Sequence, residues 1–179
     1  MERAVFLDRD GTINVDVDYL HETDKLEFID KTFEALALLK AHGYRLIVIS
    51  NQSGIGRGYF PVQDVERLHA YMNHILQEHD AAIDAFYYCP HLAEDGCACR
   101  KPQPGLIYHA AAEWDIDLPG SYMVGDNEKD VMTAVNAGCG YGLVLSGNTV
   151  SDALREKYRD HLYQNLWDFA RHICGMEVE

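Results

Sequence analysis

Acidic side chains follow two expected strands of the chain, and their spacing suits a hard metal ion. Asp8 ends the first apolar run, and Asp10 lies two residues further on, before a Gly-Thr turn. Two carboxylates this close repel each other unless a cation or a shared proton compensates the charge. Asp126 supplies a third carboxylate of the kind that Mg²⁺ prefers. A solvated acidic turn is the alternative, and the matching positions of Asp130 and Ser50 at strand ends disfavour it.

A second cluster combines thiols with an imidazole within eleven residues, and its members are Cys89, His91, Cys97 and Cys99. Three thiolates and one imidazole are the four ligands of a tetrahedral structural zinc. A free-thiol loop or a redox pair is the alternative. With all four ligands from protein, the zinc site would be closed and would not activate water. We therefore expect the zinc to fix the loop that presents Arg100 and Lys101.

Length and charge restrict the class of protein. The chain has 179 residues, 47% of them hydrophobic, and a net charge of −14. We expect a single domain over residues 1–179 with a sizeable core. The charge disfavours nucleic acid as a partner, because it repels a polyphosphate backbone. No apolar run is as long as a membrane span and the N-terminus lacks a signal-peptide pattern, which predicts a cytoplasmic protein.

The residues named above are expected in loops of an α/β fold. Apolar runs typical of buried strands are Ala4–Leu7, Leu46–Ile49, Ala85–Tyr88, Tyr122–Val124 and Tyr141–Leu145. Helical stretches are expected at Lys31–His42, Val62–His79, Pro104–Trp114, Glu128–Ala137 and Ser151–His172. This alternation predicts a Rossmann-like parallel sheet with helices on both faces. Ligands of such sheets bind beyond the carboxyl ends of the strands, where the polar loops would converge.

Four of these loops carry the sequences FLDRDGT, SNQ, CRKP and GDNEKD, and together they resemble the motifs of haloacid dehalogenase-like phosphatases. The resemblance implies Mg²⁺-dependent hydrolysis of a phosphomonoester through an aspartyl-phosphate. About forty residues separate Asp10 from Ser50, a spacing that leaves no room for a cap domain.

Longer stretches indicate a branch of this family. The flap DYLHETDKLEFID and the segment NQSGIGRG are similar to the phosphatases that act at C7 of a heptose bisphosphate in lipopolysaccharide core synthesis. The short spacing between His91 and Cys97 is instead similar to the histidinol-phosphate phosphatases, which are the alternative branch. A non-catalytic, zinc-organised interaction module is the alternative from another class.

The family resemblance implies a role for each motif residue. Asp8 is the nucleophile, and Asp10 protonates the leaving oxygen and later deprotonates water. Mg²⁺ would be held by Asp8, the Asp10 carbonyl and Asp126. Ser50 and Lys101 would bind the transferred phosphoryl group. Further substrate contacts are expected from Asp16, Tyr19, Asn51, Gln52, Ser53, Arg57 and Arg100.

Several expectations concern residues around this machinery. We expect Asp130 to orient Lys101 or the metal shell, and Arg100 to receive a second phosphate, with Arg57 as a weaker candidate. His69, like the two histidines five and ten residues later, is expected at the surface or boundary, because this spacing does not share one helical face. The expected partner is a small sugar phosphate, and the expected oligomeric state is a monomer.

Overall fold

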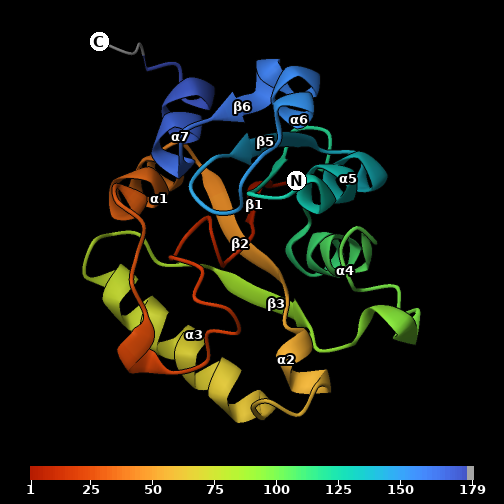
Figure 1. Cartoon of the computed structure of the whole chain (residues 1–179). Coiled ribbons are helices and arrows are strands. Elements are labelled where there is room, and N and C mark those ends of the chain that lie inside the picture. Colours follow the sequence, from red (N-terminus) through yellow and green to blue (C-terminus); the bar gives the residue numbers. More distant parts are fainter. Residues whose placement is uncertain (177–179) are drawn as a thin grey trace.

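A six-stranded parallel sheet forms the centre of the molecule (Figure 1). The structure is a computed structural model that describes residues 1–176. The strands are β1 (Arg3–Leu7), β2 (Tyr44–Asn51), β3 (Ala85–Cys89), β4 (Tyr122–Gly125), β5 (Gly140–Val144) and β6 (Leu162–Tyr163). Their order across the sheet is β3-β2-β1-β4-β5-β6, so the direction in which the chain adds strands reverses between β1 and β4.

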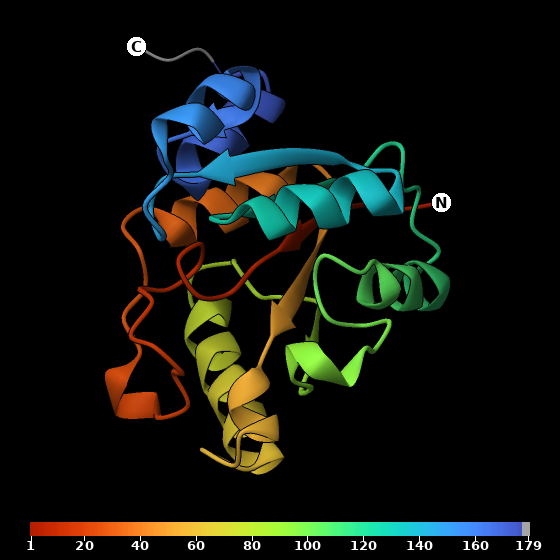
Figure 2. The same cartoon turned by 45° about the vertical axis from the view of Figure 1, so that its right-hand side comes forward.

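Helices flank both faces of the sheet. They are α1 (Thr32–Ala41), α2 (Ser53–Gly56), α3 (Val62–Gln77), α4 (Gly105–Trp114), α5 (Glu128–Ala137), α6 (Asp152–Lys157) and α7 (Leu166–Ile173). Short 3₁₀ helices are η1 (Thr23–Lys25), η2 (Ala93–Asp95) and η3 (Arg159–His161). Figures 1 and 2 show α4 and α5 on one side of the sheet and α1, α3 and α7 on the other.

Burial on both faces explains why the strands are continuous apolar runs. Val5 and Leu7 of β1 pack in the core beneath α1, α3 and α7, whereas Ala4 and Phe6 pack beneath α4 and α5. Successive strand side chains point to opposite faces, so a strand covered on both sides needs apolar residues at every position. The two cores hold the strands in register and thereby fix where each strand ends.

The predicted α/β class is confirmed, and so are the five predicted strands and four of the five predicted helices, with ends that differ by at most two residues. The continuous helix predicted over Ser151–His172 is wrong. Leu162 and Tyr163 instead pair with β5 as a sixth strand. The Asn165 side chain then accepts a hydrogen bond from the Asp168 N–H at 3.0 Å and starts α7.

The inserts at the carboxyl ends of the strands are short in the part of the chain that the structure describes. Between β1 and α1 there is only η1, and between β3 and α4 only η2, so no cap domain is formed there. None of the helices within residues 1–176 combines the length and the hydrophobicity needed to cross a bilayer.

Candidate active site

Three carboxylates meet where the strand order reverses. Leu7 pairs with Val124, and the Asp8 N–H donates to the Val124 carbonyl at 2.9 Å, so the ends of β1 and β4 lie side by side. Side-chain oxygens of Asp8, Asp126 and Asp130 lie within 4.8 Å of one another. In open parallel sheets this reversal is the position at which ligands bind.

The electrostatics of this cluster favour a cation. Burial and the neighbouring Asp8 raise the pKa of Asp126 to about 8 and that of Asp130 to about 6. Asn148 orients one of these acids, since its backbone N–H and its side-chain amide both donate to Asp126 Oδ2, at 2.9 and 3.0 Å. Clustered carboxylate oxygens that repel one another are a donor set that fits Mg²⁺.

Lys101 is a buried cation beside the three carboxylates. Its Nζ donates to Asp8 Oδ1 at 2.8 Å and to Asp130 Oδ1 at 2.7 Å, and the residue is 4% exposed. Burial acts to lower the pKa of Lys101, but the charges and hydrogen bonds of Asp130 and Asp8 outweigh it and raise the pKa. The Lys101 backbone is held by Asn51, whose Oδ1 accepts its N–H at 2.9 Å. This geometry agrees with the expected role of Asp130 in orienting Lys101.

Asp10 is held by a different set of partners. Arg9 approaches its carboxylate with two nitrogens, each at 3.1 Å, and Asn14 donates to it at 3.0 Å. Burial acts to raise the pKa of Asp10, but the charge of Arg9 and the hydrogen bonds from Arg9, Asn14 and Gln52 outweigh it and lower the pKa. Asp10 is therefore ionised in the free protein at neutral pH.

Ser50 lies near the carboxyl end of β2 and is 1% exposed. Gln52 Nε2 donates to Ser50 Oγ at 2.7 Å. Because the hydroxyl oxygen is the acceptor in that bond, its own proton is available for another oxygen, such as one on a phosphoryl group. The Gln52 amide also lies 3.4 Å from Asp10, so it links the two sides of the site.

Adjoining cavities open beside these groups. The first, of about 220 Å³, is lined by Asp8, Asp10, Asp16, Asn51, Arg100, Lys101, Asp126, Asn127, Lys129, Asp130 and Asn148. A second, of about 230 Å³, is lined by Asp10, Asp16, Asp18, Tyr19, Asn51, Gln52 and Ser53. The structure thus brings together most of the residues expected to contact substrate. Arg57 is exposed at the end of α2 and lines neither cavity.

Four residues near the site were missed by sequence reasoning. Lys129 and Asn148 line the cavity with Asp8, and Asn148 lies in the loop after β5, where the strand-end argument could have found it. Arg9, which stands between Asp8 and Asp10 in the sequence, is fully buried and contacts Asp10. The expectation that His69 lies at the surface or boundary is wrong, since it is 5% exposed and contacts Arg9, which is distant in sequence.

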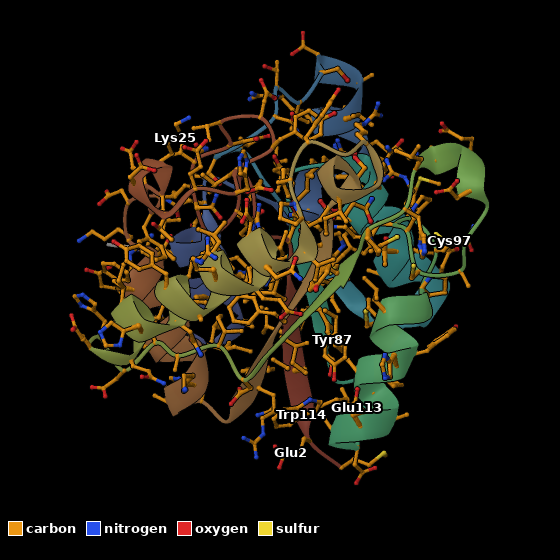
Figure 3. The ribbon with its side chains drawn as sticks, turned by 90° about the horizontal axis from the view of Figure 1, so that it is seen from below. Glu2, Lys25, Tyr87, Cys97, Glu113 and Trp114 are labelled. Atoms are coloured by element: carbon orange, nitrogen blue, oxygen red, sulfur yellow. The ribbon has the colours of Figure 1, made fainter. Side chains whose placement is uncertain are left out.

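The cysteine-rich loop after β3 forms the second candidate metal centre. Ligand atoms of Cys89, His91, Cys97 and Cys99 all lie within 4.8 Å of one another, a donor set that can hold a tetrahedral zinc. Arg100 follows directly, and its Nη1 donates to the His91 carbonyl at 3.3 Å. Figure 3 shows Cys97 in this loop, well apart from the labelled Glu2 and Trp114.

The chain is similar to known phosphatases over nearly its whole length. The HAD-hydrolase-like family model matches residues 98–169. The D-glycero-beta-D-manno-heptose-1,7-bisphosphate 7-phosphatase of Pasteurella multocida strain Pm70 is 39% identical, and the match covers 99% of this chain and 100% of that protein. The protein of the same name from Escherichia coli strain K12 is 42% identical, with 95% and 93% covered.

A solved structure is similar to this chain in both fold and sequence. The D,D-heptose 1,7-bisphosphate phosphatase of B. bronchiseptica, crystallised with magnesium and phosphate, matches with a TM-score of 0.86 and 31% identity. The match covers 97% of this chain and 98% of that one.

Proposed function

The chain belongs to the D-glycero-beta-D-manno-heptose-1,7-bisphosphate 7-phosphatase family of haloacid dehalogenase-like hydrolases, and on this premise we propose that it hydrolyses the C7 phosphate of that sugar bisphosphate. The reaction would serve the synthesis of ADP-heptose for the lipopolysaccharide core. The observation that carries the proposal is the position of Asp8 at the reversal of the sheet, 2.8 Å from the buried Lys101 ammonium.

The first step forms a bond between an Asp8 carboxylate oxygen and phosphorus while the bond between phosphorus and the C7 oxygen breaks. The electron pair of that bond goes to the leaving oxygen, which takes a proton from Asp10. Asp10 is ionised in the free protein, and the charge of the incoming phosphate favours its protonation. Water then attacks phosphorus, Asp10 takes up its proton, and inorganic phosphate leaves Asp8.

The phosphoryl oxygens need donors during this transfer. Ser50 offers a hydroxyl proton and Lys101 a charge fixed by Asp130. Asp8, Asp126 and the Asp10 carbonyl would hold Mg²⁺, which when bound compensates the negative charge on nucleophile and phosphate. Asp130 is engaged by Lys101 and keeps that ammonium in place.

The second phosphate of the substrate would bind in a neighbouring cavity. A cavity of about 340 Å³ adjoins the catalytic one and shares with it Arg100, Lys101 and Lys129. Lys101 is committed to the two aspartates, which leaves Arg100 and Lys129 to receive the distal anion. The planar fork of arginine suits bidentate contact with phosphate, and the cysteine-rich loop holds the Arg100 backbone.

A comparison of kcat/KM for the heptose bisphosphate, fructose bisphosphate and histidinol phosphate tests the substrate. We expect the heptose bisphosphate to be preferred; a preference for histidinol phosphate would overturn the assignment.

Arg100→Met should cost about 1.5–3 kcal/mol in kcat/KM for the bisphosphate and clearly less for a monophosphate, since a hydrogen bond to a charged group is lost only with the former. Arg57→Met is the matched control. Equal losses on both substrates would place Arg100 at the reacting phosphate.

We also propose that the enzyme acts in the cytoplasm as a monomer. The three thiols of the zinc cluster must be reduced to bind metal, as they are in a reducing compartment. Every group assigned to the reaction comes from one chain. If the enzyme is a monomer as proposed, light scattering should give a mass near 20.3 kDa for the active form. A stable dimer would contradict this.

A further inference from the structure

His69 is a buried histidine to which the proposed reaction assigns no role. It lies on α3, is 5% exposed, and its Nε2 is 3.1 Å from Nη1 of Arg9. Arg9 is fully buried and holds the Asp10 carboxylate with Nε and Nη2. A chain of two contacts therefore connects a helix on one face of the sheet with the expected general acid.

The chemistry of this contact determines which nitrogen of His69 carries its proton. A guanidinium is always charged and can only donate hydrogen bonds, so Nε2 of His69 must accept. The ring is then neutral, with its proton on Nδ1. Burial and the charge of Arg9 lower the pKa of His69 to about 3, in agreement with a neutral ring.

The neutral acceptor has a specific advantage over an acidic one. A carboxylate at this position would compete with Asp10 for the charge of Arg9. A neutral ring nitrogen orients the guanidinium and leaves its charge for Asp10. Within residues 1–176, His69 is the hydrogen-bond partner of Nη1, while Nη2 also reaches the Leu20 carbonyl at 2.9 Å and Gln52 at 3.3 Å.

The His69 ring is itself held in place. It stacks on Phe86 of β3 with ring centroids 4.4 Å apart and an angle of 17°, and it meets the edge of Tyr88 at 5.8 Å. Aromatic contacts on two sides restrict rotation of the ring. A fixed ring can hold a fixed guanidinium, and the Asp10 carboxylate at the other end lines both cavities of the site.

We propose that His69 is a positioning residue, which fixes Arg9 so that Arg9 holds the Asp10 carboxylate where it can reach the leaving oxygen. The inference rests on the proposed function, because it takes Asp10 as the general acid. It predicts a loss that depends on the leaving group. A sugar oxygen needs a proton when the bond to phosphorus breaks, whereas p-nitrophenolate leaves without one.

The test compares kcat/KM for a sugar phosphate and for p-nitrophenyl phosphate in holoenzyme variants. His69→Leu removes the acceptor and should lower kcat/KM for the sugar phosphate at least about 10-fold more than for p-nitrophenyl phosphate. His69→Gln keeps a side-chain acceptor and should restore most of the loss. His74→Leu replaces an exposed histidine on the same helix; it is the matched control and should change kcat/KM for neither substrate.

Equal losses on the two substrates, or no loss, would overturn the inference and leave the proposed function intact. A wild type that hydrolyses no phosphomonoester would overturn both. Where His69→Leu fails to fold, ¹⁵N shifts of the imidazole in the wild-type holoenzyme decide the matter. A proton on Nδ1 and an unprotonated Nε2 are expected, and a proton on Nε2 would overturn the proposal.

Discussion

In the proposed reaction the Asp8 carboxylate attacks phosphorus, although two buried acids beside it repel its negative charge. Lys101 resolves this conflict, because its ammonium contacts Asp8 and Asp130 together at 2.8 and 2.7 Å. Burial and the charge of Asp8 raise the pKa of Asp126 to about 8 in the metal-free protein. Lys101 thus offsets the repulsion that the neighbouring acids exert on the proposed nucleophile.

Asp8→Asn should lower kcat about 1,000-fold or more and leave the fold intact. The amide has the same shape but is a poor nucleophile, and it removes one of several crowded anions. Steady-state phosphate release measures the loss, and binding of inorganic phosphate should persist. Asp24→Asn, an exposed acid in η1, is the control. Near-normal activity in Asp8→Asn would refute the nucleophile assignment.

Strand ends made part of the site predictable from sequence. Asp8, Ser50 and Asp126 each follow a recognisable apolar run, and parallel strands bring such ends to one edge. His69 was missed for a physical reason. His69 lies on the apolar face of α3, four residues after Val65 and three before Met72, but the pattern does not show what would satisfy a buried imidazole, because its partner Arg9 is 60 positions away in the chain.

The loop from Cys89 to Lys101 joins the candidate zinc site to residues that are proposed to contact substrate. The His91 carbonyl accepts from Arg100, and the Ala98 carbonyl accepts from the Gly105 N–H at the start of α4. At Gly105 a Cβ would collide with the Ala98 carbonyl, so the loop packs against the helix more closely than any other residue would allow. Zinc bound to Cys89, His91, Cys97 and Cys99 would hold the same loop through its side chains.

Cys97→Ser should lower the zinc content from one per chain and reduce activity while the requirement for Mg²⁺ remains. The physical reason is that zinc positions Arg100 and Lys101 and activates no water. Elemental analysis and Mg²⁺ titration of activity are the measurements. Cys174→Ser, which lies outside the cluster, is the control. Zinc that replaced Mg²⁺ in catalysis would contradict this assignment.

Helix ends show how far local sequence determines an element. The predicted bounds of α5 are those observed, because Asn127 accepts from the Lys129 N–H at 3.0 Å and Gly138 ends the helix at a φ of 82°. No such local signal announces β6. Its two residues become a strand only because β5 offers an unpaired edge, and this is a property of the folded sheet.

For the whole molecule, the pH dependence of stability follows from buried groups. The pKa of Asp126 rises from 3.8 to about 8, so the folded state binds a proton that the unfolded state has released. The contribution of Asp126 to the free energy of unfolding therefore falls as pH rises between these values. His69 acts oppositely, because its pKa falls from 6.5 to about 3 and its contribution is lost as pH drops below 6.5.

Other groups titrate in the same pH range, among them His69 in the unfolded chain and the thiols that unfolding releases from zinc, so the contribution of Asp126 is measured against Asp126→Asn. Between about pH 6.5 and pH 8.5 the zinc-loaded, Mg²⁺-free wild type should lose about 1–2 kcal/mol of stability relative to Asp126→Asn. Urea unfolding at the two pH values measures this. Asp24→Asn, compared with the wild type in the same way, should show no such relative change. A stability difference between wild type and Asp126→Asn that is the same at both pH values would refute this assignment.

The place of β3 at the edge of the sheet bears on how such an enzyme diversifies. Asp8 and Asp126, to which the proposed reaction assigns the chemistry, follow the central strands β1 and β4, whereas Arg100 lies in a loop that leaves an outer strand. Substitutions in residues 90–100 that keep the zinc ligands lie outside the paired residues of the central strands. Inherited variation of this kind can change which sugar phosphate is accepted while Asp8 and Asp126 keep their places, so related enzymes can share one reaction and differ in substrate.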